Sequence, residues 1–589
     1  MSSPDEDAAP TTPTRLAVYL VEPGPRACDT WRLPPHVLTA LRGIRPHVDL
    51  LVVGVRGTLL DEDEAPLTRL ADEVRCGTDV SHHTIVESLG DEVARFDQVL
   101  LTGSGWFGPV ADLGAVLERM RTVPVWSLVP RATSGPLGSV EAITVGLDPD
   151  WYVMSGSIAA SGALAAWRRT GAGLQLESGP SGGAGYAFSP DRYPSTDPVL
   201  MNLPQLLDDG LPFVPLRSFG VDPLVADRLA VVPADGFERL KATGIEMSEV
   251  WRGLLDQVPL RVLSTNLALT RVIGARPPAR TTRSRTAAIL HLYYDELTDE
   301  LMDRVDLLPG HVDVYVTTTD DTRRASIEAR LTARARQYTH EVRVVASNRG
   351  RDISALLIGC ADVIGDESYD LVVKLHGKKS VQDDVNASAW FRRHLFENLL
   401  PSAGAVAELY EWFAEDPQLG IAVPPVIHMY YPTLGHAWLG NRKTAEDLAA
   451  RLGLGVPFDD DTPVAPYGSM FVARRDALVP WLSLGLTWND FPDGSGYADG
   501  TLAHAVERMF CYVAAGTGRF TATVLGPSVA GTEYGFLEYK VQAVGSKLPA
   551  YAIDQVALLE TGHGTWRSAL ARRLPGFAAV YRTLRRRAV

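Results

Sequence analysis

The chain has 589 residues, which is too long for one hydrophobic core, so we expect roughly two to four domains. Its net charge of −15 argues against a protein that binds nucleic acid mainly through phosphate contacts. No apolar run reaches the roughly 18–20 residues of a membrane-spanning helix. The four cysteines are too scattered for a disulfide framework or a structural zinc site, which favours a reducing compartment such as the cytoplasm.

The first part of the chain alternates predicted strands and helices. The polar, Pro-rich residues 1–14 are expected to be a disordered tail. The patterns predict core strands at 15–21 and 48–55, a strand ending at residue 101, and a helix over 113–120. Such alternation favours a parallel or mixed α/β sheet.

A second alternating series follows the Pro/Arg/Thr-rich residues 276–285, which we predict to be a linker. Strands are expected at 287–294 and 312–319, and a charged helix at 322–338. Two further strands are expected, one in "EVRVVA" before residue 347 and one over 369–375.

Residues 76–101 and 349–375 are similar enough to predict an internal repeat. In both segments 18 positions separate two aspartates, Asp79 from Asp97 and Asp352 from Asp370. We therefore predict a fold of two tandem α/β units, a diverged one over 15–275 and a second over 286–550. A basic C-terminal segment, 551–589, follows them.

The segment "NRGRDIS", 348–354, carries the first group of candidate site residues. Arg349 and Arg351 are suited to phosphate, and Asn348 with its neighbouring glycine suits a tight turn. Asp352 either accepts a hydrogen bond from a ribose or base, or caps the helix that follows.

Cations gather where the strand 369–375 ends: Lys374, His376, Lys378 and Lys379. Ligands of open α/β sheets bind at the carboxyl ends of strands, so these residues predict an anionic ligand such as a diphosphate. The alternative is a solvated basic turn. The first unit has the uncharged "TGSGW" here, so the charged residues of the second unit are the better functional candidates.

Two later segments complete the candidate set. Gly468 and Ser469 allow close approach of a ligand, and Arg474 is within reach of a phosphate, although an ordinary strand–helix corner explains them equally well. Asp499 is predicted near the start of a helix over 499–510, where it suits a general base or, alternatively, an N-cap. The acidic segment 458–463 is expected to be a solvated loop rather than a metal site.

Six segments in one order give a resemblance to the rhamnan synthesis protein F family: "HLYYDEL", "VYVTTT", "NRGRDIS", "YDLVVKLHGKKS", "GSMFVARRDAL" and "DGTLAHAVERMF". The family is regarded as glycosyltransferase-like, of the GT-A type with a Rossmann-like sheet. The resemblance implies a nucleotide-sugar donor such as dTDP-rhamnose and a lipid-linked or polysaccharide acceptor. Most GT-A enzymes hold a divalent metal with Asp-x-Asp at the position where this chain has Lys374 and His376, so we expect no metal and no other cofactor.

The resulting hypothesis is a glycosyltransferase of cell-surface polysaccharide synthesis. Asp499 would be the general base, with Glu507 as second choice, and Thr317 would face the nucleotide base. The alternative is a non-catalytic carbohydrate-binding or assembly module of the same pathway. We expect a cytoplasmic protein that contacts the inner face of the plasma membrane through its basic C-terminal segment.

Overall fold

The computed structural model describes most of the chain. The described residues are 12–24, 30–129, 151–160, 169–170, 173–174, 185–188, 192–193, 197–274, 284–336, 338–377, 385–493, 499–546 and 548–559. The predicted N-terminal tail up to residue 11, the predicted linker up to residue 283, and residues 560–589 lie outside them, as do Lys378 and Lys379.

The first sheet has seven strands in the order β12-β8-β9-β6-β1-β3-β5. All neighbours are parallel except those of β9, which is antiparallel to both β6 and β8. The strands are β1 (Arg15–Val21), β3 (Leu50–Arg56), β5 (Glu73–Gly77), β6 (Gln98–Gly103), β8 (Val125–Ser127), β9 (Tyr152–Ser155) and β12 (Gly185–Tyr186).

The second sheet has eight strands in the order β14-β21-β19-β20-β18-β15-β16-β17, and β20 is its single antiparallel strand. The strands are β14 (Thr270–Val272), β15 (Arg285–His291), β16 (His311–Thr318), β17 (Thr339–Val344), β18 (Leu371–His376), β19 (Leu419–Val423), β20 (Phe471–Arg474) and β21 (Phe520–Leu525). The prediction of a mixed α/β fold with two tandem, parallel-dominated sheets is confirmed.

The first sheet and strands β15 to β21 of the second have the same topology. When the seven strands of each are numbered along the chain, their spatial order is the same in both. The register agrees as well, because β6 meets β9 at Leu101↔Tyr152 and β18 meets β20 at Lys374↔Phe471. Asp97 and Asp370 have the same role, because each accepts a hydrogen bond from a backbone N–H at the start of the first strand of its unit. The donors are Thr14 just before β1 (2.8 Å) and Arg285 at the start of β15 (2.7 Å). These shared aspartates are therefore structural.

The alignment of the two segments, which pairs Asp79 with Asp352 and therefore Gly77 with Gly350, is wrong at its upstream end. Gly77 is the last residue of β5, whereas Gly350 lies six residues beyond β17, at the start of helix α15 (Arg351–Leu357). Asp79 precedes helix α3 (His82–Leu89), while Asp352 lies inside the first turn of α15. The loop after β17 is therefore longer, and the ungapped match was a coincidence of spacing.

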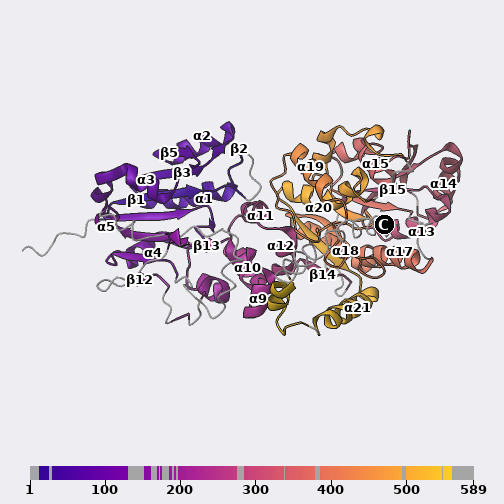
Figure 1. The fold of residues 1–589 in the computed structure, drawn as a ribbon. Helices are drawn as coiled ribbons and strands as arrows, with labels where there is room; N and C mark the ends of the chain where they lie inside the picture. Colours follow the sequence, from indigo (N-terminus) through magenta and orange to yellow (C-terminus); the bar gives the residue numbers. More distant parts are fainter. Residues whose placement is uncertain are drawn as a thin grey trace, which may run out of the picture.

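Helices cover both sheets and fill the space between them, as Figure 1 shows. Those of the first half are α1 (Pro35–Ile44), α2 (Asp61–Leu70), α3, α4 (Leu113–Arg119), α5 (Gly156–Ala160), α6 (Pro198–Met201), α7 (Leu203–Asp208), α8 (Arg217–Gly220), α9 (Pro223–Leu229), α10 (Pro233–Lys241), α11 (Met247–Leu255) and α12 (Leu260–Asn266). Those of the second are α13 (Thr298–Val305), α14 (Asp321–Ala333), α15, α16 (Ala361–Gly365), α17 (Val385–Leu399), α18 (Ala403–Glu415), α19 (Arg442–Leu452), α20 (Leu502–Gly516) and α21 (Pro527–Gly545).

The two halves share one continuous hydrophobic core. Trp251 of α11 stacks on Phe520 of β21 with ring centroids 4.4 Å apart, and Arg252 donates to the carbonyl of Gly516 at 2.6 Å. β14 precedes the predicted boundary at residue 275 yet pairs with β21. The chain therefore enters the second sheet before the predicted linker, and α9 to α12 join the halves.

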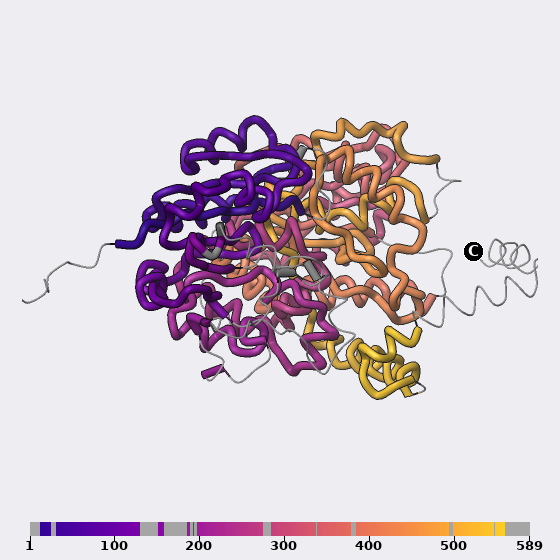
Figure 2. The backbone as a smooth tube through the Cα atoms, turned by 60° about the vertical axis from the view of Figure 1, so that its left-hand side comes forward, coloured from indigo at the N-terminus to yellow at the C-terminus, as the bar shows by residue number. Residues whose placement is uncertain are grey.

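Among the described residues, no helix combines the length and hydrophobicity needed to cross a membrane. In the tube view of Figure 2, α21 and the segment after it stand off at the lower edge of the second half.

Candidate active site

Three neighbouring parallel strands of the second sheet end in a row of polar residues. The register places Thr317 of β16 beside His291 of β15, and His291 beside His376 of β18. The Thr317 hydroxyl donates to the carbonyl of Leu290 at 3.1 Å, so its oxygen can accept from His291 Nδ1, 3.0 Å away. Burial lowers the pKa of His291 to about 4, so this imidazole is neutral at neutral pH.

Lys374 lies two residues before His376 on β18 and is almost completely buried, with 1% of its surface exposed. Its ammonium donates to Asp352 Oδ2 at 2.6 Å, to the carbonyl of Ser469 at 2.6 Å and to the Ser469 hydroxyl at 3.1 Å. An ammonium has three protons, and each of these has a protein acceptor. Lys374 therefore ties the start of α15 to the turn before β20.

Asp352 is the carboxylate at the centre of this cluster. It accepts from Lys374 and from the Ser469 hydroxyl, and His376 Nδ1 lies 3.7 Å from its Oδ2. Burial alone would raise the pKa of Asp352, but His376, Lys374 and Ser469 together hold the pKa well below its usual value. Asp352 is therefore a permanent anion that holds several groups in place.

Two tight left-handed turns face each other across Asp352. Gly350 (φ +75°) and Arg351 (φ +53°) form one, and Gly468 (φ +86°) and Ser469 (φ +51°) form the other. Positive φ is unfavourable for residues with a Cβ, so the backbone at Arg351 and Ser469 is strained. A Cβ on Gly468 would lie 2.8 Å from a methyl group of Leu395, so a larger residue there would have to displace that side chain.

Glu507 of α20 fixes the second of these turns. Its Oε1 accepts from the backbone N–H of Gly468 at 2.8 Å and lies 2.8 Å from Nη1 of Arg508. The guanidinium of Arg508 lies over the ring of Tyr467 at 4.6 Å. These contacts give Glu507 a structural task and make it a poor candidate for a proton acceptor.

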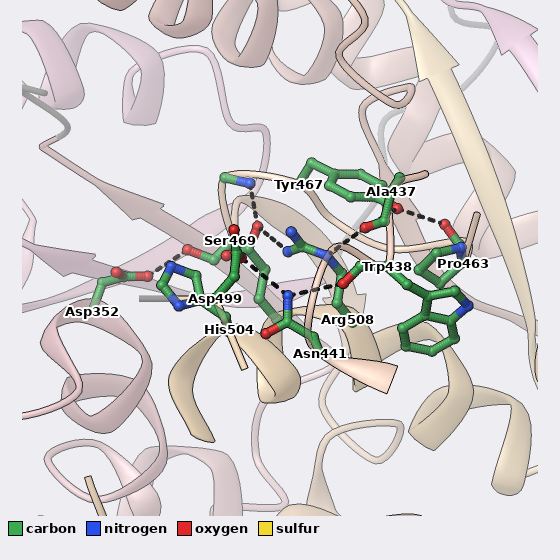
Figure 3. A network of polar contacts seen from close by, with 12 residues as sticks. Asp352, Ala437, Trp438, Asn441, Pro463, Tyr467, Ser469, Asp499, His504 and Arg508 are labelled. Atoms are coloured by element: carbon green, nitrogen blue, oxygen red, sulfur yellow. Dashed lines mark hydrogen bonds and ion pairs between the residues drawn. The ribbon is translucent and has the colours of Figure 1, made fainter. Parts of the chain in front are cut away.

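Asp499 lies on the exposed turn before α20, and Figure 3 draws it in one network of polar contacts with Asp352, Ser469 and His504. Its Oδ1 accepts from Asn441 Nδ2 at 3.2 Å. The helix begins at Leu502 with Thr501 as its N-cap, three residues later than predicted, so Asp499 does not cap it. The N-cap alternative for Asp499 is wrong.

The structure corrects three of the predicted donor contacts. Lys374 gives all its protons to protein oxygens and cannot meet a diphosphate directly in this arrangement. Thr317 is fully buried and orients His291 instead of facing a nucleotide base. Arg474 pairs with Leu371 at the opposite end of β18, where its guanidinium donates to the carbonyls of Leu419, Phe413 and Asp416.

Three further candidates keep accessible positions. Asn348, Arg349 and Arg351 are exposed in the loop that leads into α15. Asn348 opposes, weakly, the fall in the pKa of His291 that burial causes, so this loop lies near the strand ends. Within the described part of the chain, no group of three or more His, Cys, Asp or Glu side chains is arranged to hold a metal ion.

Sequence reasoning missed two residues of this region, His291 and Asn441. His291 ends a strand that leads into a recognised segment, and the pairing of β15 with β18 could have identified it. Asn441 is in a long loop without any motif. The acidic segment 458–463 is not fully solvated as expected, because Asp459 is buried and accepts from Tyr512 and from the backbone of Arg261.

The profile of a protein family described as "Rhamnan synthesis protein F" matches residues 187–518. Two curated relatives from strains of Xanthomonas campestris pv. campestris, both called "Uncharacterized protein WxcX", are 34% identical over 238 residues. The match covers 40% of this chain and 32% of each relative. The chain therefore spans about a third of the length of these relatives.

Among solved structures, the mannosyltransferase PcManGT from Pyrobaculum calidifontis, in complex with GDP-Man and Mn2+, is 12% identical with a TM-score of 0.24. The match covers 58% of this chain and 75% of that one. The glycosyltransferase GlyE of Streptococcus pneumoniae TIGR4 is 10% identical with a TM-score of 0.23, over 64% of this chain and 90% of that one. Similarities of this size carry no argument about function.

Proposed function

The chain belongs to the rhamnan synthesis protein F family, and from this premise we propose that it is a glycosyltransferase of cell-surface polysaccharide synthesis. The observation that supports this most is the cluster of Asp352, Lys374, His376 and Ser469 at the carboxyl edge of the second sheet. Two strained turns and a buried ion pair at one strand edge are costly to build, and such features concentrate at functional sites. The first sheet has the apolar Leu101 at the register position of Lys374.

The donor in this proposal is a nucleotide sugar of the dTDP-rhamnose type, held outside the ends of β15, β16 and β18 in a GT-A-like manner. Arg349 and Arg351 meet the diphosphate, because they are exposed and a guanidinium matches phosphate geometry. His376, beside the permanent anion Asp352, supplies a further donor at the strand end. Lys374 acts from behind by holding Asp352 and the Gly468–Ser469 turn in place.

The acceptor in this proposal is a hydroxyl group of a lipid-linked or polysaccharide glycan. Asp499 removes the hydroxyl proton while the acceptor oxygen attacks the anomeric carbon of the donor. The bond between that carbon and the diphosphate breaks, and the nucleoside diphosphate leaves with the electron pair. The arginines stabilise the leaving charge, and a single displacement of this kind inverts the anomeric configuration.

Replacement of Asp499 by Asn tests this mechanism. The variant should lose at least about a hundredfold in transfer while binding the donor with unchanged affinity, because an amide cannot take the proton. Asp490→Asn is the matched control, since Asp490 caps the nearby turn at Thr487 and should leave transfer unchanged. Transfer at the wild-type rate by Asp499→Asn would exclude Asp499 as the base.

Independence from divalent metal is a further part of the proposal, because Arg349, Arg351 and His376 are the cations that meet the diphosphate in it. Prolonged dialysis against EDTA should leave the transfer rate unchanged. Loss of transfer that Mn²⁺ or Mg²⁺ restores would contradict it. Donor binding with no turnover on any lipid-linked acceptor would instead favour the non-catalytic module.

Peripheral membrane contact at the cytoplasmic face would bring a lipid-linked acceptor to the site. The support for it is compositional, since residues 560–589 contain seven arginines and one acidic residue. Sedimentation with vesicles containing about one third anionic lipid should retain the full chain and release a chain that ends at residue 559. Equal binding of the two chains would remove this part of the proposal.

A further inference from the structure

Asn441 is a fully buried amide immediately before α19, and each of its side-chain hydrogen-bonding groups is used. Its Nδ2 group donates to Asp499 Oδ1 at 3.2 Å and to the carbonyl of Trp438 at 3.0 Å. Its Oδ1 accepts from the backbone N–H of Gly500 at 2.6 Å. A carboxylate partner needs a donor and an N–H partner needs an acceptor, so these contacts fix which way the amide points.

The Asn441 amide holds a turn that is otherwise exposed. Gly500 has φ +92°, a conformation that favours glycine, and its carbonyl accepts from the Thr444 hydroxyl at 2.9 Å. Two side chains from the start of α19 therefore hold the Asp499–Gly500 turn in place. Asn441 contacts the Asp499 carboxylate and the Gly500 N–H, and Thr444 contacts the Gly500 carbonyl. Figure 3 shows Asn441 reaching from beside Trp438 towards Asp499.

We infer that Asn441 is the positioning residue of the general base. It holds Oδ1 of Asp499 in one place, which leaves Oδ2 to receive the proton of the acceptor hydroxyl. A buried donor of fixed orientation removes the rotational freedom that an exposed aspartate otherwise has, and correct geometry contributes strongly to rate. This inference rests on the proposed function, since it assigns a task relative to Asp499.

The anchor of Asn441 extends into the first half of the chain. The Trp438 carbonyl accepts from Asn441, and the Trp438 indole N–H donates to the carbonyl of Asp459 at 2.7 Å. The Asp459 carboxylate accepts from the backbone N–H of Arg261 in α12 at 2.9 Å. The Arg261 side chain donates to the carbonyls of Thr462 and Pro463. The helices between the sheets therefore support the loop that holds Asn441.

A double-mutant cycle tests the inference with dTDP-rhamnose as donor and a synthetic polyprenyl-diphosphate-linked monosaccharide as acceptor. Asn441→Ala should lower kcat by about tenfold to a hundredfold, with unchanged donor affinity by calorimetry and unchanged KM for the acceptor. In the Asp499→Asn background the same substitution should have no further effect on kcat, because Asn441 acts only through Asp499. Thr332→Val, a control on the exposed face of α14 whose hydroxyl donates to the carbonyl of Glu328, should change kcat by less than about threefold.

A swapped pair keeps the test informative if Asn441→Ala folds poorly. Asn441→Asp combined with Asp499→Asn restores an amide–carboxylate pair but leaves the Trp438 carbonyl without its donor, so its thermal stability should exceed that of Asn441→Asp alone without reaching the wild-type value. Transfer should stay lost because the carboxylate is in the wrong place. Equal losses from Asn441→Ala in both backgrounds, or recovery of transfer by the swapped pair, would overturn the inference. Normal transfer by Asp499→Asn alone would instead overturn the proposed function.

Discussion

Replacement of Lys374 by Met is the most informative perturbation of the strand-end cluster. The variant keeps the length and apolar stem of the side chain but removes the ammonium and its contacts with Asp352 and Ser469. The carboxylate of Asp352 then remains buried without its closest cation. Breaking one side of a buried ion pair costs about 3–5 kcal/mol, because the remaining charge is left uncompensated.

The free energy of unfolding that Lys374→Met loses should become smaller as the pH falls. In the wild type the pKa of Asp352 is depressed, so its contribution to stability is present above the unfolded-state pKa near 3.9 and is lost only as pH falls through the lower folded-state pKa. Without Lys374 only His376 and Ser469 oppose the effect of burial, so the pKa of the Asp352 carboxyl rises relative to the wild type and the variant takes up a proton at a higher pH than the wild type does. The difference in free energy of unfolding between the wild type and Lys374→Met should therefore decrease from pH 7 to pH 4.

Guanidinium denaturation followed by circular dichroism measures these differences. The control is the double variant Lys374→Met, Asp352→Leu, which removes both charges and should recover to within about 2 kcal/mol of the wild type. Leu101 supports this control, because the first sheet buries an aliphatic side chain at the same register position. A loss below about 1 kcal/mol for Lys374→Met, or a double variant as unstable as the single one, would refute the reasoning.

The remaining predictions concern the turn before β20 and the histidine in the row of strand ends. Gly468→Ala should destabilise the protein by about 1–3 kcal/mol in the same assay, because of its positive φ and the close Leu395 methyl, whereas Gly404→Ala, with open space around it, should not. A neutral Gly468→Ala would contradict the strained turn. Since the pKa of His291 is lowered to about 4, the wild type should lose up to about 3 kcal/mol as pH falls from 6.5 to 4, and His291→Gln should lose less. Identical pH profiles would show that His291 is not held neutral.

The sheets could be predicted from sequence because their strands are short, apolar and bounded by turn residues. The strand predicted over 15–21 is β1, and the predicted strands near 287–294 and 312–319 correspond to β15 and β16 within a few residues. The presence of two α/β sheets could also be predicted, but the alignment of the two segments failed where the loop after β17 lengthens. Spacing along a chain does not report how many residues a loop has gained.

The candidate site could be predicted as a location but not as a set of contacts. Lys374 was correctly placed at a strand end, yet sequence could not reveal that Asp352, 22 positions earlier, and Ser469, 95 positions later, take its protons. Arg474 was misplaced for a related reason, since alternation does not state that β20 runs antiparallel and carries this residue to the other edge. Asn441 acts through a tertiary contact with a turn 58 residues away.

The central claim is that the carboxyl edge of the second sheet binds a nucleotide sugar. Calorimetric titration of the full chain with dTDP-rhamnose, and with UDP- and GDP-sugars for comparison, tests it most directly. We predict one molecule bound per chain, and at least tenfold weaker binding when Arg349 and Arg351 are both replaced by Ala. Binding by no nucleotide sugar, or equal affinity in the double variant, would contradict the claim.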